Sequence, residues 1–381
     1  MAESTLLKIL RNASPAQKVI RQSGRDMGLA DGEPFPFLAL IGQREMKLAL
    51  LLSIINPAIG GVLLIGSRGT AKTTAVRSLI DLLPNVTRSL CSEGLNCTEA
   101  AIEKDGLSAV CKSCATKFGY DEPLSRQEKM RLIELPLNAQ LTDVVGGINE
   151  RTLAEKSKVR LEKGILAQAD NHLLYIDEVN LLEDGVLDAI LDASAQGYYT
   201  VRRGPNNPTY RSRFVLTGSM NPEEGTLRPQ IMDRFGLRVI VRGLEDPDDR
   251  YLAYEQSLRH RQNSEELSAE YATATLDLAA EVQKAADLLP EVTISPEAKS
   301  MGLNIVSAAK IESSRAEITM FEAARAYAAS DGRTVVEPAD IQAVALLALR
   351  QRQSPQLAAF FDAQEQEDGK LLELIEQQNN K

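Results

Sequence analysis

The stretch GGVLLIGSRGTAKTTAVRSLIDLL (60–83) decides the fold that this 381-residue chain is expected to adopt. Its first part, GGVLLIG (60–66), is a short apolar run ending in glycine and predicts a buried strand, whereas TAKTTAVRSLIDLL (70–83) predicts a helix. Between them, GSRGTAKT (66–73) matches the phosphate-loop pattern G-x-x-x-x-G-K-[ST], except that Ala71 replaces the second glycine. A strand, a phosphate loop and a helix in this order indicate a nucleotide-binding domain.

The residues of this loop predict how a nucleotide is held. The backbone N–H groups and the helix N-terminus would cradle the phosphates, Lys72 would neutralise the β- and γ-phosphates, and the Thr73 hydroxyl would reach Mg²⁺. The methyl group of Ala71 is tolerable if the backbone there is helical rather than at positive φ. A glycine turn with a chance lysine is the alternative reading. The expected ATP-binding residues are Gly66, Ser67, Arg68, Gly69, Thr70, Ala71, Lys72, Thr73 and Thr74.

Further strands and helices extend this unit. Four more apolar runs predict strands, and helical stretches, the first of them REMKLALLLSII (44–55), accompany them, so an α/β fold with a mostly parallel sheet is expected. After about residue 244 the strand signal disappears and helical runs follow. The predicted strands are RLIELP (131–136), LLYIDE (173–178), FVLTGS (214–219) and LRVIV (237–241), and the later helical runs are 265–289, 295–311, 318–330 and 337–352.

These patterns and the composition predict the organisation and class of the protein. The net charge of −10 argues against a general nucleic-acid binder. No apolar run reaches the roughly 18 residues of a membrane helix, and the N-terminus lacks the apolar segment of a secretory signal, so a cytoplasmic protein is expected. The expected parts are an N-terminal extension (1–33), a nucleotide-binding domain (34–244) with a cysteine-rich insertion (91–114), a helical C-terminal domain (245–362) and a charged tail (363–381).

Polar residues that follow two of the predicted strands are candidate catalytic groups. Behind a phosphate loop, the Asp-Glu pair of LLYIDE predicts that Asp177 holds Mg²⁺ through water and that Glu178 acts as general base. Two solvated acids at a strand end are the alternative. In FVLTGSMNPEEG (214–225), Asn221 is predicted to orient the attacking water, and it could also be a turn former.

Three arginines are candidates for stabilising the charge of a transition state. Arg228 and Arg234 lie in LRPQIMDRFGLRVIV, close to a strand, and either one could reach the γ-phosphate of a neighbouring subunit. The alternative is an ion pair with a local acid such as Asp233 or Glu224. Arg315, in KIESSRAEITM at the start of a C-terminal helix, could reach the phosphates from the helical domain.

Taken together, these pieces resemble an AAA+ ATPase, and more closely the small ATPase subunits of magnesium chelatases. The resemblance covers roughly residues 35–350 and is carried by PFPFLALIGQREMKLALLLSIINPAIGGVLLIGSRGTAKTTAVRSLIDLLP, LLYIDEVNLLEDGVLDAILDASAQG and RFVLTGSMNPEEGTLRPQIMDRFGL. By motif position it implies that Asn221 is sensor 1, Arg234 the arginine finger and Arg315 sensor 2. It also implies that residues 149–170 are the family's inserted helical or hairpin region.

The resemblance implies a hexameric ring with ATP at the subunit interfaces, and two kinds of partner. One is an AAA-like subunit with an integrin-type metal-binding domain, and the other is a large subunit that binds porphyrin and inserts Mg²⁺, a ligase reaction that forms nitrogen–metal bonds. On this reading the chain hydrolyses ATP for chlorophyll or bacteriochlorophyll biosynthesis and does not touch porphyrin.

Three departures from the family pattern keep other readings open. They are Ala71, Ser67 in place of a common aspartate, and SSRAE (313–317), which lacks a glycine after its arginine. The alternatives are a MoxR-like remodelling chaperone, a cobalt-chelatase ATPase subunit, and a nucleotide-gated scaffold without useful hydrolysis.

All four cysteines lie in CSEGLNCTEAAIEKDGLSAVCKSC (91–114), spaced C-x5-C-x13-C-x2-C. Cys111 and Cys114 form the usual metal knuckle, and Cys97 with Cys91 would complete the four ligands of a structural Zn²⁺. A redox-active pair, unligated thiols, an iron–sulfur cluster and a regulatory disulfide are the alternatives. Because the stretch lies between the phosphate-loop helix and the next strand, it is expected to hold a loop rather than to catalyse.

Overall fold

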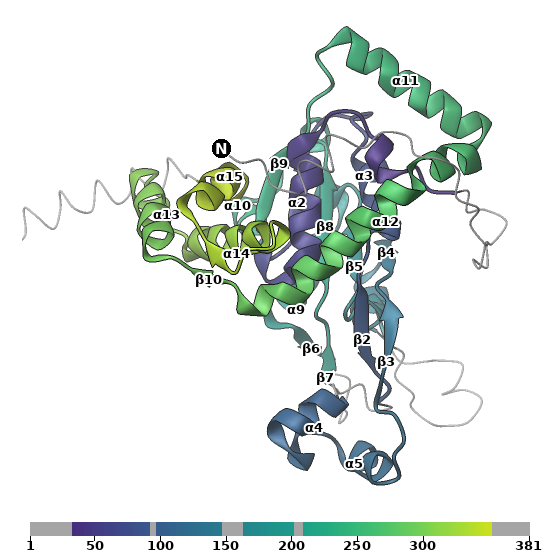
Figure 1. Cartoon of the computed structure of the whole chain (residues 1–381), viewed down its shortest axis with the longest axis vertical. Helices are drawn as coiled ribbons and strands as arrows, with labels where there is room; N and C mark the ends of the chain where they lie inside the picture. The colour runs from purple at the N-terminus through teal and green to yellow at the C-terminus, as the bar shows by residue number, and fades with distance from the viewer. Residues whose placement is uncertain (1–32, 92–96, 147–162, 202–208, 353–381) are drawn as a thin grey trace, which may run out of the picture.

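A five-stranded parallel sheet forms the centre of the computed structural model, which describes residues 33–91, 97–146, 163–201 and 209–352 (Figure 1). The strand order is β4-β5-β8-β1-β9, and all neighbours pair in parallel. The five predicted strands are therefore confirmed. Their bounds are β1 (Val62–Ile65), β4 (Leu132–Leu135), β5 (Leu173–Ile176), β8 (Val215–Met220) and β9 (Leu237–Ile240).

The apolar run of β1 is continuous because the sheet is covered on both faces. Val62 and Leu64 pack into one core, and Leu63 and Ile65 pack into the other, as the two-residue period of a strand requires. The first core contains α2 (Arg44–Ile55), which has the predicted bounds, together with the C-terminal helices. The second core contains α6 (Leu141–Val145), α8 (Ile165–Gln168), α9 (Asp184–Gln196) and α10 (Pro229–Met232).

The C-terminal half is helical, as predicted, with one difference. The expectation that strands end near residue 244 is wrong, because two short strands pair in parallel, β10 (Thr293–Ile294) and β11 (Val335–Val336). Pro296 and Pro338 occupy first helical positions, where proline's missing N–H costs nothing. The helices are α11 (Pro247–Gln262), α12 (Ser264–Leu288), α13 (Pro296–Ala308), α14 (Ser314–Ser330) and α15 (Pro338–Leu349), and α11 projects away from the sheet in Figure 1.

Two features around the phosphate-loop helix were not predicted. The helix expected over 70–83 is shorter, because α3 (Lys72–Arg77) gives way to the 3₁₀ turn η3 (Ser78–Asp81). The segment that follows is an antiparallel hairpin that carries two short helices at its tip, at the bottom of Figure 1. The hairpin is β2 (Asn85–Ser89) with β3 (Ser125–Lys129), its helices are α4 (Glu99–Asp105) and α5 (Lys112–Gly119), and a second hairpin pairs β6 (Tyr198–Thr200) with β7 (Thr209–Arg211).

Some predictions fall outside the described residues. They concern the N-terminal extension up to residue 32, residues 149–162 of the inserted region, and the chain from residue 353 onward, which includes the charged tail. Among the helices that are described, none combines the length and the apolar character needed to cross a lipid bilayer.

Candidate nucleotide-binding site

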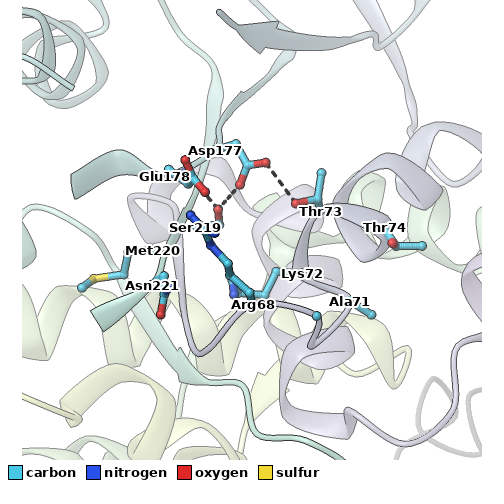
Figure 2. Close-up of a pocket in the computed structure, with 11 residues that line it drawn as sticks. Arg68, Ala71, Lys72, Thr73, Thr74, Asp177, Glu178, Ser219, Met220 and Asn221 are labelled. Carbon is cyan, nitrogen blue, oxygen red and sulfur yellow. Dashed lines mark hydrogen bonds between the residues drawn. The ribbon is translucent and has the colours of Figure 1, made fainter. Parts of the chain in front are cut away.

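The phosphate loop, the Asp-Glu pair and Asn221 meet at the carboxyl edge of the sheet. They follow β1, β5 and β8, and β8 lies between the other two strands, so the three segments are neighbours in space. Figure 2 shows their side chains around one pocket. The pocket is lined by Arg68, Gly69, Ala71, Lys72, Thr73, Thr74, Asp177, Glu178, Ser219, Met220 and Asn221. The structure thus brings together most of the residues predicted to bind nucleotide.

Gly66 and Lys72 shape the two ends of the loop. A Cβ atom at Gly66 would lie 2.1 Å from the carbonyl oxygen of Val241, so only glycine fits where the loop leaves β1. The Lys72 ammonium donates to the carbonyl oxygens of Gly66 and Ser67, at 2.7 and 2.8 Å. Burial lowers the pKa of Lys72, and nearby carboxylates, Asp177 first, oppose this shift. The lysine therefore stands between the loop carbonyls and the acidic side of the pocket.

Ala71 adopts a left-handed conformation, with φ 64° and ψ 21°, directly before α3. The sequence analysis expected alanine to be tolerated here only if the backbone were helical, without a positive φ. That condition is not met. A Cβ atom in this conformation crowds the following carbonyl oxygen and costs about 1–2 kcal/mol. The glycine of the usual pattern adopts the same geometry without that strain. The loop thus keeps its conformation at a cost in stability.

Ala71→Gly is expected to stabilise the folded protein by about 0.5–1 kcal/mol, because relief of the strain outweighs the freedom that glycine adds to the unfolded chain. Urea denaturation without nucleotide measures the change. Gly69→Ala is the matched control, because Gly69 has a φ of 77° and nothing lies within 4 Å of the position of its added Cβ. That methyl group adds backbone strain without a steric clash, so Gly69→Ala should destabilise the folded protein. A urea midpoint for Ala71→Gly below that of the unmodified chain would contradict the strain argument.

Asp177 is held by three hydrogen bonds. Its Oδ2 accepts from Thr73 Oγ1 at 3.1 Å, and its Oδ1 accepts from Tyr175 OH at 2.9 Å and from Ser219 Oγ. Burial would raise the pKa of Asp177, but hydrogen bonds from Ser219, Tyr175 and Thr73 outweigh it and keep the pKa below its usual value. An ionised carboxylate therefore lies beside a threonine hydroxyl. These are oxygen ligands of the kind that Mg²⁺ prefers, so the residues present fit a Mg²⁺-bound nucleotide.

Tyr175 and Ser219 are site residues that the sequence analysis missed. Tyr175 precedes Asp177 by two residues, so the strand period directs both side chains to the same face, and this signal is readable in LLYIDE. Ser219 lies on β8, and its Oγ also accepts from the Glu178 backbone N–H at 3.2 Å. Its role depends on β8 being the neighbour of β5, which one sequence does not reveal.

Glu178 and Asn221 line the same pocket from adjacent strands. Glu178 adopts a left-handed backbone with φ 50° where the chain turns out of β5. Asn221 is buried, and its Oδ1 accepts from the Glu223 backbone N–H at 3.3 Å, which caps the 3₁₀ turn η6 (Pro222–Glu224). The turn-forming role of Asn221 is confirmed. Because Oδ1 holds the turn, Nδ2 is the end of the amide that can donate to a ligand.

Arg228 and Arg234 do not line the described pocket of their own chain. Arg234 Nη1 lies 2.9 Å from Asp192 Oδ1 and 3.4 Å from Asp188 Oδ1 on α9, and Arg228 forms an ion pair with Asp184 on the same helix. Ion pairs with local acids are therefore confirmed for both, but the suggested acids were wrong. The side chains of Arg228 and Arg234 are 52% and 29% exposed, so both remain open to solvent.

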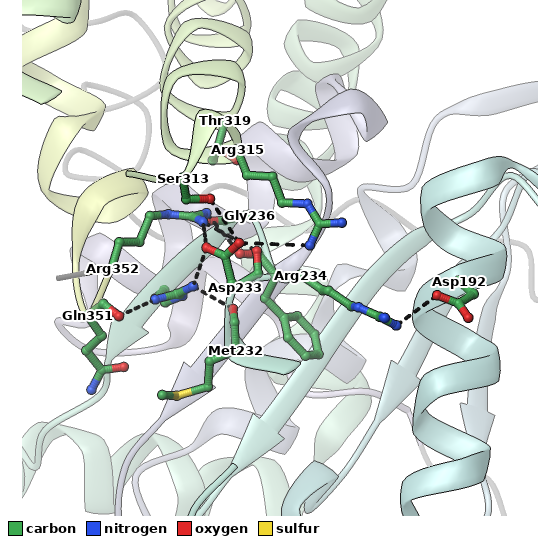
Figure 3. A network of polar contacts seen from close by, with 12 residues as sticks. Asp192, Met232, Asp233, Arg234, Gly236, Ser313, Arg315, Thr319, Gln351 and Arg352 are labelled. Atoms are coloured by element: carbon green, nitrogen blue, oxygen red, sulfur yellow. Dashed lines mark hydrogen bonds and ion pairs between the residues drawn. The ribbon is translucent and has the colours of Figure 1, made fainter. Parts of the chain in front are cut away.

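Asp233 joins the C-terminal helices to the sheet (Figure 3). Its carboxylate accepts from Arg352 Nη1 at 2.5 Å and from Ser313 Oγ at 2.9 Å. Arg352 has a fully buried side chain and also donates to the two backbone carbonyls that follow Arg234. Arg315 Nη1 lies 4.0 Å from Asp233 Oδ2, so in this conformation Arg315 contacts Asp233 and does not line the described pocket. The predicted contact between Arg315 and the phosphates stays a prediction.

The four cysteines lie together at the tip of the β2–β3 hairpin, away from the pocket. The Sγ atoms of Cys91, Cys97, Cys111 and Cys114 all lie within 4.8 Å of one another. Figure 1 shows α4 and α5, which carry this region, at the opposite end of the view from α3. The cysteines are therefore not part of the nucleotide site.

Comparisons with known proteins identify the family of the chain. Residues 304–371 match the AAA lid domain family. The chain is 40% identical over 355 residues to a magnesium-chelatase subunit ChlI homolog of Methanocaldococcus jannaschii, a match that covers 91% of this chain and 93% of that protein. It is 40% identical over 320 residues to magnesium-chelatase subunit ChlI of Synechocystis sp., which covers 84% of this chain and 88% of that protein.

A solved structure supports the fold independently. A protein of Cytophaga hutchinsonii is 20% identical, and the match covers 82% of this chain and 83% of that chain with a TM-score of 0.51. This likeness concerns the fold alone. The identities, the lid match and the geometry of the pocket agree with one another, and the chain therefore belongs to the magnesium-chelatase ChlI subunit family, with an AAA+ P-loop domain followed by a helical lid.

Proposed function

We propose that this chain is the ATP-hydrolysing motor subunit of a magnesium chelatase, which drives the insertion of Mg²⁺ into protoporphyrin IX by a large partner subunit. The observation that carries the proposal is the grouping of Lys72, Thr73 and Asp177 at the sheet edge, in a chain that is 40% identical to a ChlI subunit over 84% of its length. The complex performs a ligase reaction that forms nitrogen–metal bonds. This chain contributes conformational work to that reaction and no porphyrin contacts.

The phosphates of ATP bind against the loop and the N-terminus of α3, where backbone N–H groups and the helix dipole favour negative charge. Lys72 exchanges its loop carbonyls for β- and γ-phosphate oxygens. Thr73 and, through water, Asp177 would hold the accompanying Mg²⁺, which would neutralise phosphate charge. Despite burial, hydrogen bonds from Ser219, Tyr175 and Thr73 keep the pKa of Asp177 low, so this carboxylate stays ionised at neutral pH.

Hydrolysis requires a water molecule aligned with the γ-phosphate. Glu178 lines the pocket next to Asp177 and takes the proton from that water as general base. Asn221, whose Oδ1 is fixed by the turn, donates from Nδ2 to the water or the γ-phosphate. The rigid attachment of both side chains to strand ends is what gives them defined positions.

We also propose the assembly. The chain forms a homohexameric ring in the cytoplasm with ATP at each interface, where Arg234 reaches the γ-phosphate of the neighbouring subunit and Arg315 acts as sensor 2 after the lid moves. The exposed part of the Arg234 side chain and its position outside its own pocket support a role across an interface. The ring acts on an AAA-like subunit with an integrin-type domain and on the large porphyrin-binding subunit.

Reconstitution tests this function. The chain is mixed with the two partner subunits of a chelatase, ATP, Mg²⁺ and protoporphyrin IX, and the fluorescence of the magnesium porphyrin is followed. ATP-dependent product is expected, and Glu178→Gln serves as the inactive control. A parallel mixture with Co²⁺ and the partner subunits of a cobalt chelatase tests the alternative, and insertion there but not in the Mg²⁺ mixture would identify a cobalt-chelatase ATPase. ATP hydrolysis without insertion of either ion would favour a MoxR-like chaperone, a reading that the identity to ChlI subunits already disfavours.

A further inference from the structure

The tip of the β2–β3 hairpin carries a small folded unit, the cysteine module, which consists of Cys91 and residues 97–124. We propose that Cys91, Cys97, Cys111 and Cys114 bind one Zn²⁺, and that this ion is the structural centre of the module. The site has no part in ATP hydrolysis, so a test of this proposal is independent of a test of the chelatase function.

The four sulfur atoms have the spacing that a single zinc ion requires. With Zn–S bonds of about 2.3 Å, the corners of a regular tetrahedron lie about 3.8 Å apart. Cys91 Sγ and Cys111 Sγ are 3.7 Å apart, and all four Sγ atoms lie within 4.8 Å of one another. A disulfide would bring two sulfurs to about 2.05 Å, much closer than the pair observed.

The backbone around the thiols is arranged as in a metal knuckle. The N–H of Cys111 donates to Cys97 Sγ at 3.3 Å, a contact that stabilises negative charge on the sulfur. Cys111 is the N-cap of α5 and Cys114 lies in its first turn, so the start of the helix directs both side chains to the same place. On the other side, Ser89 Oγ donates to the Cys97 carbonyl oxygen at 2.8 Å and ties this residue to the hairpin.

The module has only a small apolar core, and the Glu99 carboxylate adds hydrogen bonds from Leu124 and Ser125. The buried core of the module consists of three cysteines and Leu124, with Ile102, Val110 and Cys111 packed against them. A unit of this size does not bury enough apolar surface to order itself, and small domains of this kind depend on a metal or disulfides. Because cysteines make up most of the core, a bound metal explains both the clustering and the order of α4 and α5.

The arrangement disfavours the other readings of the cysteines. The irons of an iron–sulfur cluster lie apart from one another, so its thiolates must be more widely spread than a single ion requires. Cys91, Cys97 and Cys114 are buried and Cys111 is partly exposed, so a redox-active Cys111–Cys114 pair would account for only two of the four clustered thiols. A single tetrahedral ion with soft sulfur ligands is the remaining match, and Zn²⁺ is the common ion of Cys₄ sites.

Metal analysis of the full chain tests the proposal. Purified protein should contain about one zinc per chain, and titration with a mercurial reagent should release that zinc as about four thiols react. Co²⁺ exchanged into the site should give the intense thiolate charge-transfer and tetrahedral ligand-field absorption of a Cys₄ centre. Cys111→Ser/Cys114→Ser should lose the zinc. Ser113→Ala, between the same two cysteines and exposed, is the matched control and should keep it.

Each other outcome would overturn the proposal. Metal-free wild-type protein with four thiols that react rapidly in the native state means that the module holds itself together without an ion. Thiols that appear only after reduction mean disulfides, and iron with visible absorption means a cluster. Since these measurements use the wild-type chain, their interpretation does not depend on whether the double variant folds. Removal of zinc should also speed proteolytic cleavage within 97–124, and unchanged cleavage would refute the structural role.

Discussion

Arg234→Ala is expected to slow ATP hydrolysis by about 10³–10⁵-fold, because an arginine that reaches the γ-phosphate stabilises transition-state charge to this extent. ATP binding should change little, since Arg234 does not line the described pocket of its own chain. In the structure the Arg234 guanidinium lies 2.9 Å from Asp192 Oδ1, and the side chain is 29% exposed, so in the proposed ring it can exchange this ion pair for a phosphate bound by the next subunit. Steady-state ATP turnover and equilibrium binding of a fluorescent ATP analogue measure the two effects.

A mixture of inactive variants separates catalysis across an interface from catalysis within one subunit. An Arg234→Ala subunit keeps Glu178, and a Glu178→Gln subunit keeps Arg234, so a complete site forms where the first receives the arginine of the second. In an equal random mixture about a quarter of the interfaces of a ring are complete. Partial recovery of ATP turnover is expected, whereas no recovery would count against the arrangement across the interface.

Arg228→Ala is the matched control for this prediction. Arg228 is also an arginine paired with an acid of α9, Asp184, and at 52% it is more exposed than Arg234. If Arg234 is the finger, Arg228→Ala should keep most of the ATP turnover. The reverse pattern, with a large loss only in Arg228→Ala, would transfer the role to Arg228.

Glu178→Gln is expected to lower ATP turnover by about 10²–10⁴-fold, which is the usual contribution of a general base. Glutamine has nearly the same shape, so the left-handed turn after β5 and the bond from the backbone N–H to Ser219 Oγ should persist. ATP should therefore bind about as tightly as to the unmodified chain and remain unhydrolysed. Single-turnover hydrolysis with pre-bound ATP isolates the chemical step.

Two further variants make this result specific. Asp177→Asn removes the carboxylate that Thr73, Tyr175 and Ser219 hold, and it should weaken Mg²⁺-dependent ATP binding as well as turnover. Glu223→Gln makes the same chemical change as Glu178→Gln at an exposed residue outside the described lining, and it should have little effect. A Glu178→Gln protein that turns over ATP at a near-normal rate would exclude Glu178 as the base.

The sheet and the polar ends of its strands could be predicted because each depends on local sequence. A short apolar run bounded by glycines, such as GGVLLIG, indicates a buried strand, and glycine, lysine and threonine at fixed spacing indicate the loop. The ion-pair partners of Arg234 and Asp233 could not be predicted, because these contacts depend on how α9 and the C-terminal helices pack against the sheet. The hydrogen bond from Ser219 to Asp177 likewise follows from strand order, a long-range property.

Ala71 and the hairpin show the limits of local reasoning in two ways. The sequence identified Ala71 as a departure, but the sign of its φ is set by the loop closing against β1 and α3. Residues 85–89 and 125–129 are polar and partly exposed, so they lack the apolar alternation that indicates a strand, and only their pairing with each other makes them β2 and β3. The cysteine spacing, in contrast, correctly indicated that the four thiols lie together, since all four cysteines are in one short stretch of sequence.

The carboxylate of Asp233 has a mechanical consequence for the proposed ring. Asp233 holds Arg352 and Ser313 of the C-terminal region, and the next residue in the chain is Arg234. A rotation of the lid that carries Arg352 and Ser313 with it would therefore either break these contacts or shift the backbone beside Arg234. If Arg234 is the arginine finger proposed above, closure of the lid of one subunit would change the position of the arginine that this subunit presents to its neighbour, and the two ATP sites would be coupled through Asp233.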